Sequence, residues 1–286
     1  GYIRREQSIP YIMGANITTL ADTLVAAMIT GNAVAVQIVL AEAIGVSIVS
    51  LLLLWEGLVR IGDVRPFVLR APSRIVRHLW EFRGDFAAAA WVTLQHAVIG
   101  SAIGLGVALL LGALMAASSF VEQATGPVLT LLQVTPFVAY IASVVLWLGS
   151  GTAPALFVVA LVCVPGFAFA TNDGMRSADP DTRELLASVD ASWWEVLWRL
   201  RLPSALPSIF TAMRYNVGLA LIAAYLVEGG NFATEGLGAI GVRAAAFGGN
   251  GADALWAAIL AMALLGTVWL VAISVTRSEE HTSELQ

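Results

Sequence analysis

Long runs of apolar residues, each about as long as a lipid bilayer is thick, are the feature that most limits how this chain can fold. A hydrocarbon core about 30 Å thick takes roughly 20 apolar residues of α-helix to cross. Since backbone polar groups find no partners in lipid, each crossing must satisfy them within a helix. The sequence therefore predicts an all-α, polytopic membrane protein. We expect six crossings, at 36–59, 91–117, 128–148, 154–171, 206–227 and 255–275.

The composition of the 286 residues supports this fold class. Hydrophobic residues make up 58% and charged residues 12%, and the mean hydropathy is +0.82, whereas soluble domains are about a quarter charged. A net charge of -5 gives no basic surface for nucleic acid. The single cysteine, Cys163, lies inside an apolar run, so we expect a buried thiol with no disulfide and no metal cluster.

The two ends of the chain are set apart from this membrane domain, which we place at 36–276. Residues 1–35 are mixed in polarity and receive no assignment. The last ten residues, 277–286, resemble the in-frame translation of a common sequencing-adapter oligonucleotide, so they are excluded from the fold prediction.

Two further patterns concern helix placement. An Arg-rich stretch at 60–86 carries apolar residues at helical spacing around residue 79, which is equally typical of a helix in the membrane interface and of a solvated loop helix. Small residues let helices approach closely in lipid, so four glycines of the second crossing should mark a helix-packing face. These glycines are Gly100, Gly104, Gly106 and Gly112.

The longest polar interruption in the second half of the chain, 172–205, has the pattern of a two-faced helix. Asp179 can cap a helix whose first residue is Pro180, where the missing N–H has no consequence, and Leu202-Pro203 should end it. Such a segment is too polar to cross the membrane and too apolar to lie free in water, so it predicts a partner surface. Its apolar residues are Leu185, Leu186, Val189, Trp193, Val196, Leu197 and Leu200, and Trp194 and Trp198 add to the surface.

This segment resembles the EAA loop of ATP-binding-cassette (ABC) importer permeases. Glu184 takes the first place of that motif, Asp190 the seventh, and Leu200-Arg201-Leu202-Pro203 its end. Leu185 and Leu186 stand where the family has two alanines, and Asp190 stands where it has glycine. Aspartate tolerates a left-handed turn, so the sequence is compatible with a bend at Asp190 and with an unbroken helix.

Other motifs are similar to one branch of these permeases, the nitrate, sulfonate, taurine and pyrimidine-precursor type. The motifs are Ala71-Pro72-Ser73, Thr135-Pro136, Trp147-Leu148-Gly149, Asp179-Pro180, Glu228 and Gly236-Leu237-Gly238. The resemblance covers roughly residues 50–275 and implies a type I importer (MetI-like) transmembrane domain. It leaves the solute open among nitrate, bicarbonate, sulfonates, taurine and pyrimidine precursors.

The resemblance also implies partners and a location. We expect a cytoplasmic ABC ATPase dimer, an extracytoplasmic solute-binding protein and a second permease copy, identical or not, in the inner (plasma) membrane with a cytoplasmic N-terminus. The arginines divide evenly between the two sides and do not orient the chain. The residues implied in ATPase coupling are Glu184, Leu185, Leu186, Asp190, Trp193, Trp194, Leu200, Leu202 and Pro203.

No P-loop, HExxH or GxSxG motif is present, so we expect no enzyme activity, no metal and no cofactor on this chain, with ATP bound by the partner. A secondary transporter and a membrane anchor without transport are the alternative functions.

Five residues are candidates for the solute pathway: Gln133, Thr135, Pro136, Tyr140 and Glu228. The alternatives are hydrogen bonds between helices for Gln133, Thr135 and Tyr140, and a solvated helix end for Glu228. His96 has no second ligand at metal-binding spacing, so it should be a packed, hydrogen-bonded residue.

Overall fold

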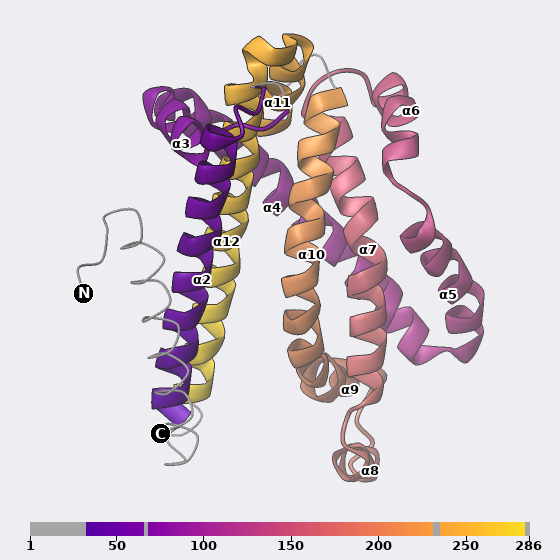
Figure 1. Cartoon of the computed structure of the whole chain (residues 1–286). Coiled ribbons are helices and arrows are strands. Elements are labelled where there is room, and N and C mark those ends of the chain that lie inside the picture. The colour runs from indigo at the N-terminus through magenta and orange to yellow at the C-terminus, as the bar shows by residue number, and fades with distance from the viewer. Residues whose placement is uncertain (1–32, 66–67, 231–234, 284–286) are drawn as a thin grey trace. The chain divides into compact units, whose positions relative to one another are not determined.

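The computed structural model of the chain describes residues 33–65, 68–230 and 235–283, and these ranges contain helices and no strand (Figure 1). Side chains are described within residues 43–272. Most of the unassigned segment 1–35 lies outside the described residues. The helices are α2 (Ala33–Ile61), α3 (Pro72–Glu81), α4 (Arg83–Ala117), α5 (Ser119–Val134), α6 (Val138–Leu148), α7 (Thr152–Arg176), α8 (Pro180–Ser188), α9 (Trp193–Val196), the π-helical turn η1 (Leu197–Arg201), α10 (Leu202–Gly230), α11 (Leu237–Ala246), the 3-10 turn η2 (Gly248–Gly251) and α12 (Ala252–Ser283).

The prediction of six crossings agrees with the structure to within one crossing. Five helices among the described residues are long and apolar enough to cross a membrane, and α5 with α6 makes a sixth if that bent pair is one span. The five are Ala43–Ile61, Arg83–Ala117, Thr152–Arg176, Trp193–Gly230 and Ala252–Ala272. The helix expected near residue 79 is present as α3, and its place in the membrane interface stays a prediction. The helix α12 runs through Ser283, into the ten residues set apart as an adapter sequence.

The third crossing, predicted at 128–148, is not one straight helix. Helix α5 begins nine residues earlier, at Ser119, and its axis makes an angle of 102° with that of α6. Thr135 between them is extended, with φ -71° and ψ 123°. The ring of Pro136 disfavours the helical conformation for the residue before it and removes one donor. The chain therefore turns at this point instead of crossing straight.

The chain divides into two compact units, residues 1–76 and 77–286. In the first, Glu56 near the end of α2 accepts hydrogen bonds from the backbone N–H of Ser73 (2.9 Å) and from its hydroxyl (2.7 Å). The guanidinium of Arg60 also donates to this carboxylate. These bonds tie the start of α3 to the end of α2.

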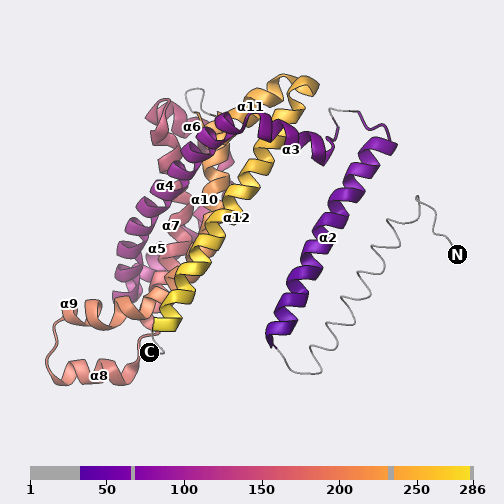
Figure 2. The same cartoon turned by 90° about the vertical axis from the view of Figure 1, so that its left-hand side faces the viewer.

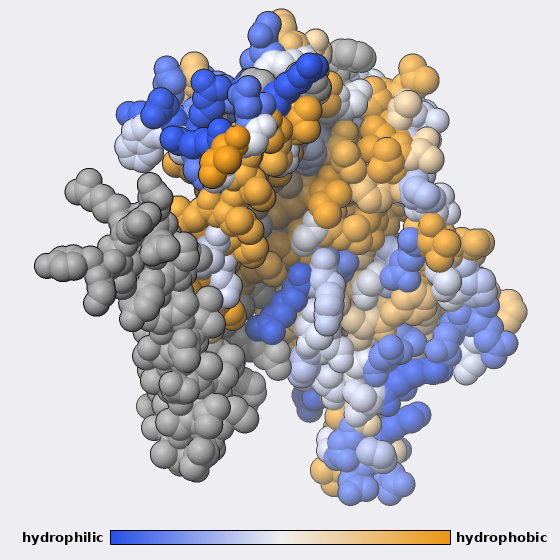
Figure 3. Space-filling view, viewed as in Figure 1, coloured by the Kyte–Doolittle hydropathy of each residue, from blue (hydrophilic) through white to orange (hydrophobic). Residues whose placement is uncertain are grey.

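In the second unit, α7 is the central helix and packs along both α4 and α10 (Figure 2). Its buried side chains include Val158, Val159 and Phe167. Cys163 is fully buried on the same helix, as predicted from the sequence. Figure 3 shows a band of apolar side chains across one face and mostly polar side chains at the lower end, where α8 and α9 lie.

Of the four glycines of the predicted second crossing, which lies within α4, three face α7 and one does not. A Cβ atom added to Gly112 would lie 2.6 Å from the Cβ of Thr171, and one added to Gly104 would lie 2.7 Å from the carbonyl oxygen of Ala160. Gly100 is equally close to α7, whereas a Cβ on Gly106 meets nothing within 4 Å. The assignment of Gly106 to the packing face was wrong. Gly106 lies two residues after Gly104, and two residues of α-helix rotate the side-chain direction by about 200°.

This contrast gives a matched test of the α4–α7 contact. Gly112→Val should destabilise the protein by about 1–3 kcal/mol, since the new side chain would overlap the side chain of Thr171 and the carbonyl oxygen of Ala168. Gly106→Val introduces the same β-branched residue into the same helix where there is space. Thermal unfolding of the detergent-solubilised protein should therefore show a lower Tm for Gly112→Val alone. Equal shifts for the two variants would contradict this assignment of the packing face.

Candidate functional site

The polar segment between α7 and α10 begins with a capped helix at the predicted position. The backbone N–H of Thr182 donates to Asp179 Oδ2 (3.0 Å), the Thr182 hydroxyl donates to the same oxygen (2.5 Å), and Pro180 is in the first turn of α8. The hydroxyl and backbone donors of Thr182 lower the pKa of the Asp179 carboxyl. The cap is therefore present at neutral pH and is lost only as the pH falls through that lowered value.

Asp190 turns the chain between α8 and α9. It has φ +51°, a left-handed conformation that aspartate adopts more readily than most residues. The N–H of Ala191 donates to the carbonyl of Leu186 (3.0 Å), which closes the end of α8. The bend at Asp190 is confirmed and the unbroken helix is wrong. The apolar residues predicted to share one helix face are consequently divided between two helices.

The helix that follows starts with a capping box that the sequence analysis missed. Ser192 Oγ accepts from the N–H of Glu195 (3.3 Å), and Glu195 Oε2 accepts from the N–H of Ser192 (2.9 Å). The spacing Ser-x-x-Glu before an apolar run is the signal that could have identified it. The prediction that Leu202-Pro203 ends this helix is wrong. The π-helical turn η1 continues into α10, where Pro203 occupies the first turn and tolerates the loss of its N–H.

Helices α8 and α9 have no buried residue among their side chains. Five large apolar side chains of this segment are each more than half exposed: Leu185, Val189, Trp193, Trp194 and Trp198. We call this set the tryptophan surface. Its rings contact one another, with centroids 5.9 Å apart for Trp193 and Trp194 and 5.7 Å apart for Trp194 and Trp198. An exposed aromatic cluster at the end of a helical bundle is typical of a protein interface.

The nine residues implied in coupling occupy two different environments. Glu184, Leu185, Asp190, Trp193, Trp194 and Pro203 are exposed, and Leu186 is half-buried. Leu200 is buried, and Leu202 packs beside Met175, Ala205 and Ile209. The first group can contact a partner, whereas Leu200 and Leu202 attach the segment to the bundle.

The two ends of the segment meet closely at its base. A Cβ atom added to Gly174 at the end of α7 would lie 2.6 Å from the Cα atom of Ala205 in α10. Beside this contact, Arg176 forms a 2.7 Å ion pair with Glu122 of α5, and the Asn172 amide donates to the same carboxylate (3.2 Å). The segment that carries α8 and α9 is therefore anchored at the ends of α7 and α10, and α7 is joined there to α5.

A buried polar cluster centred on Glu228 lies at the opposite end of α10 (Figures 1 and 2). Glu228 is fully buried, so the alternative of a solvated helix end is wrong. Its carboxylate accepts from the Thr93 hydroxyl (2.8 Å) and the Gly238 N–H (3.1 Å), and it pairs with His96 Nδ1 (2.8 Å). The prediction of a packed, hydrogen-bonded His96 is confirmed.

The same cluster fixes the start of α11. The Thr93 hydroxyl oxygen accepts from the N–H of Leu237 (2.9 Å), so one threonine joins α4 to both α10 and α11. A Cβ atom on Gly236 would lie 1.9 Å from the Glu228 carboxylate, and therefore only glycine fits there. Glu228, His96 and the glycines could each be recognised as candidates in the sequence, but no sequence pattern pointed to Thr93.

The remaining pathway candidates lie at the α5–α6 break. Gln133 and Thr135 are exposed, as is Pro136, and Tyr140 is half-buried. The hydroxyl of Thr135 donates to the carbonyl of Leu131 in its own helix (2.7 Å). This bond satisfies the hydroxyl locally and leaves the role of these residues in a pathway as a prediction.

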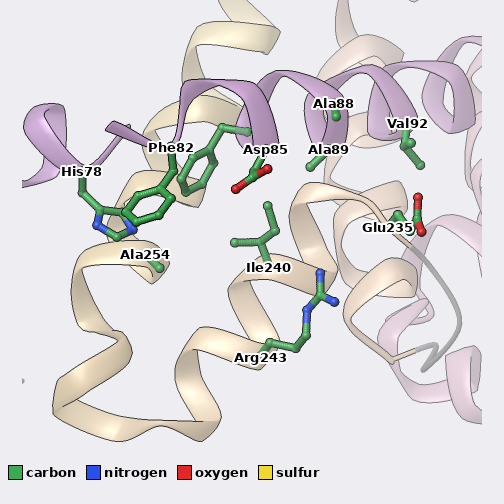
Figure 4. Close-up of a pocket in the computed structure, with 11 residues that line it drawn as sticks. His78, Phe82, Asp85, Ala88, Ala89, Val92, Glu235, Ile240, Arg243 and Ala254 are labelled. Atoms are coloured by element: carbon green, nitrogen blue, oxygen red, sulfur yellow. The ribbon is translucent and has the colours of Figure 1, made fainter. Parts of the chain in front are cut away.

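A cavity of about 470 Å³ lies between α4 and α11, at the same end as the Glu228 cluster (Figure 4). The carboxylates of Asp85 and Glu235 and the guanidinium of Arg243 border it, together with the rings of His78 and Phe82. The guanidinium donates to the carbonyl of Ala239 in its own helix (3.1 Å). Two carboxylates against one guanidinium make this cavity acidic on balance.

The crossings, the broken α5–α6 pair and the attached polar segment together define a helical membrane-transport permease. Comparison with known protein families agrees, since residues 104–277 match the model of the binding-protein-dependent transport system inner membrane component. The chain belongs to this family of ABC-importer permeases, which lie in the inner membrane. Such permeases are not enzymes themselves, and ATP hydrolysis and solute capture lie with separate ATPase and binding-protein subunits.

Individual relatives differ in the solute they carry. The formylaminopyrimidine transport permease ThiX of Halalkalibacterium halodurans is 32% identical over 78% of this chain and 88% of its own. The taurine permease TauC of Escherichia coli is 28% identical over 66% and 70%, and the putative aliphatic sulfonate permease SsuC of Bacillus subtilis is 25% identical over 61% and 64%. The fold is similar to inward-facing structures of the MetNI methionine ABC transporter, with a TM-score of 0.53 and 16% identity over 66% of this chain and 95% of that chain.

Proposed function

We propose that this permease moves a small solute of the nitrate, sulfonate, taurine or pyrimidine-precursor type across the cytoplasmic membrane, driven through α8 and α9 by a separate ATPase dimer. The observation that carries the proposal is the tryptophan surface, which is exposed and yet joined to three helices of the bundle. An importer of this kind would hold two permease copies, identical or not, with ATP on the partner and no cofactor on this chain.

The coupling step follows from where the segment is attached. A nucleotide-driven closure of the partner can change the bundle only through contacts that differ between its two states. Glu184 and the tryptophan surface would make these contacts, and the Gly174–Ala205 and Arg176–Glu122 contacts would pass the movement to α7, α10 and α5. Movement of α5 would then reach the break beside Thr135 and Pro136, where Gln133 and Tyr140 are our candidates for the pathway.

The proposed coupling requires one orientation of the chain in the membrane. The tryptophan surface would lie in the cytoplasm, together with the N-terminus, and the Glu228 cluster with its acidic cavity would face the binding protein outside. A secondary transporter or an anchor would have no need of an exposed aromatic surface outside the lipid.

Cross-linking in native membranes tests the proposal. A photoreactive benzoylphenylalanine at Leu185 should form an adduct that mass spectrometry identifies as an ABC ATPase. The same group at Leu146, which is 88% exposed on α6, should form none, because that position is predicted to face lipid. The absence of an ATPase adduct from Leu185, or labelling of this segment from outside the cell, would refute the coupling function.

A further inference from the structure

Arg214 lies within the fifth predicted crossing, 206–227, on the 29-residue helix α10. At 1.5 Å per residue it is about 12 Å along the helix from Leu206 and about 20 Å from Val227. A long side chain near a crossing end can extend to the interface, but a charge this far inside is costly in lipid.

No acidic side chain among the described residues pairs with the charge of Arg214. Its side chain is exposed, and no hydrogen bond or ion pair to it occurs within residues 33–65, 68–230 and 235–283. Thr211 and Gly218 share its helix face at spacings of three and four and are exposed, and the exposed Tyr215 lies next to Arg214, four residues after Thr211 and three before Gly218. Tyr215 is 77% exposed, and a Cβ atom on Gly218 would meet nothing within 4 Å. We call these four residues the polar face of α10.

A polar stripe whose cation has no partner among the described residues is a poor surface to place against lipid tails, since charged residues in crossings almost always face protein or a water-filled cavity. We propose that the polar face of α10 lines the aqueous solute pathway and that Arg214 is a binding site for a small oxyanion. This inference rests on the proposed function, and it selects one solute class within it.

The chemistry of guanidinium points to that class. Its planar set of N–H donors matches two oxygens of one carboxylate, nitrate or sulfonate group, and its charge persists at any physiological pH. Tyr215, the next residue, is also exposed and carries a hydroxyl that can add a donor. The acidic cavity beside Glu235 has the opposite charge balance. Arg214 therefore favours an anionic or sulfonate-bearing solute over a neutral ring.

Cysteine labelling tests this without knowing the solute, because Cys163 is the single cysteine and is buried. Tyr215→Cys in native membranes should react with water-soluble methanethiosulfonates, and faster with the anionic ethylsulfonate reagent than with the cationic trimethylammonium reagent. Adding Arg214→Gln should lower this anion-to-cation rate ratio by about tenfold, since it removes a full positive charge from the adjacent residue. Val268→Cys, on an exposed apolar position of α12, is the control and should not react.

Three results would overturn the inference. Tyr215→Cys could be inert to both reagents, the rate ratio could be the same with and without Arg214, or Tyr215→Cys could form a disulfide with a second copy and exclude water from this face. Labelling requires neither uptake nor an ATPase, so its failure is separate from a failure of the proposed function. Arg83→Gln, which removes an exposed charge at the start of α4, should leave the ratio unchanged.

Discussion

Trp194→Asp is expected to reduce ATP-driven uptake about 30-fold or more while the protein remains in the membrane. Trp194 is 59% exposed at the centre of the tryptophan surface, between Trp193 and Trp198. Central tryptophans in interfaces commonly account for 2 kcal/mol or more of binding, and a buried carboxylate would add a desolvation penalty. Uptake and ATP hydrolysis measured in the same proteoliposomes should show hydrolysis no longer linked to transport.

Glu184→Arg should have the same effect by reversing an exposed charge on α8. The matched controls are Trp194→Phe, which keeps an aromatic ring, and Glu184→Gln, which removes the charge without reversing it. Both controls should retain more uptake than the corresponding charged variant. Normal uptake by both Trp194→Asp and Glu184→Arg would count heavily against coupling through this surface.

Glu228→Ala should destabilise the folded protein by about 3–5 kcal/mol, because it removes the shared acceptor of a fully buried hydrogen-bonded cluster. His96, the Thr93 hydroxyl and the Gly238 N–H would all lose their acceptor in a site without water access. Thermal unfolding in detergent should show a large fall in Tm. Glu81→Ala, which truncates an exposed acid in α3, should change stability by no more than about 0.5 kcal/mol.

A compensating variant separates a structural role from a transport role for Glu228. Replacing the cluster by apolar residues, with Glu228→Met, His96→Leu and Thr93→Val together, should recover part of the lost stability, since no buried polar partner is then left unsatisfied. If Glu228→Ala instead kept its Tm and lost uptake, the carboxylate would act in the solute pathway and the structural role would be wrong.

Prolines show how far the sequence could predict the fold. Pro127, Pro165 and Pro207 all lie inside helices that continue past them, whereas the chain turns sharply at Pro136. Neighbouring helices in a bundle can satisfy the carbonyls that a proline frees, so the residue alone does not decide between a tolerated position and a break. The positions of the straight crossings followed from local hydropathy, but the α5–α6 break did not.

In the candidate site, too, the features that depend on nearby residues could be predicted from the sequence, and those that depend on distant residues could not. The Asp179 cap could be predicted because its donor lies three residues away, and Asp190 could be recognised as a possible turn from its own side chain. Glu228 could not be placed, because its partners His96 and Thr93 are 132 and 135 residues away in the sequence. Burial that depends on such distant contacts leaves no local pattern.

The contact between Gly174 and Ala205 has a consequence for how such permeases can diversify. Because the chain leaves the bundle and returns to it at nearly one point, we expect α8 and α9 to form an insert that can be replaced while Leu200 and Leu202 keep the segment attached to the bundle. A different insert of the same span could recognise a different motor subunit. Choice of motor and choice of cargo can thus evolve independently in one chain.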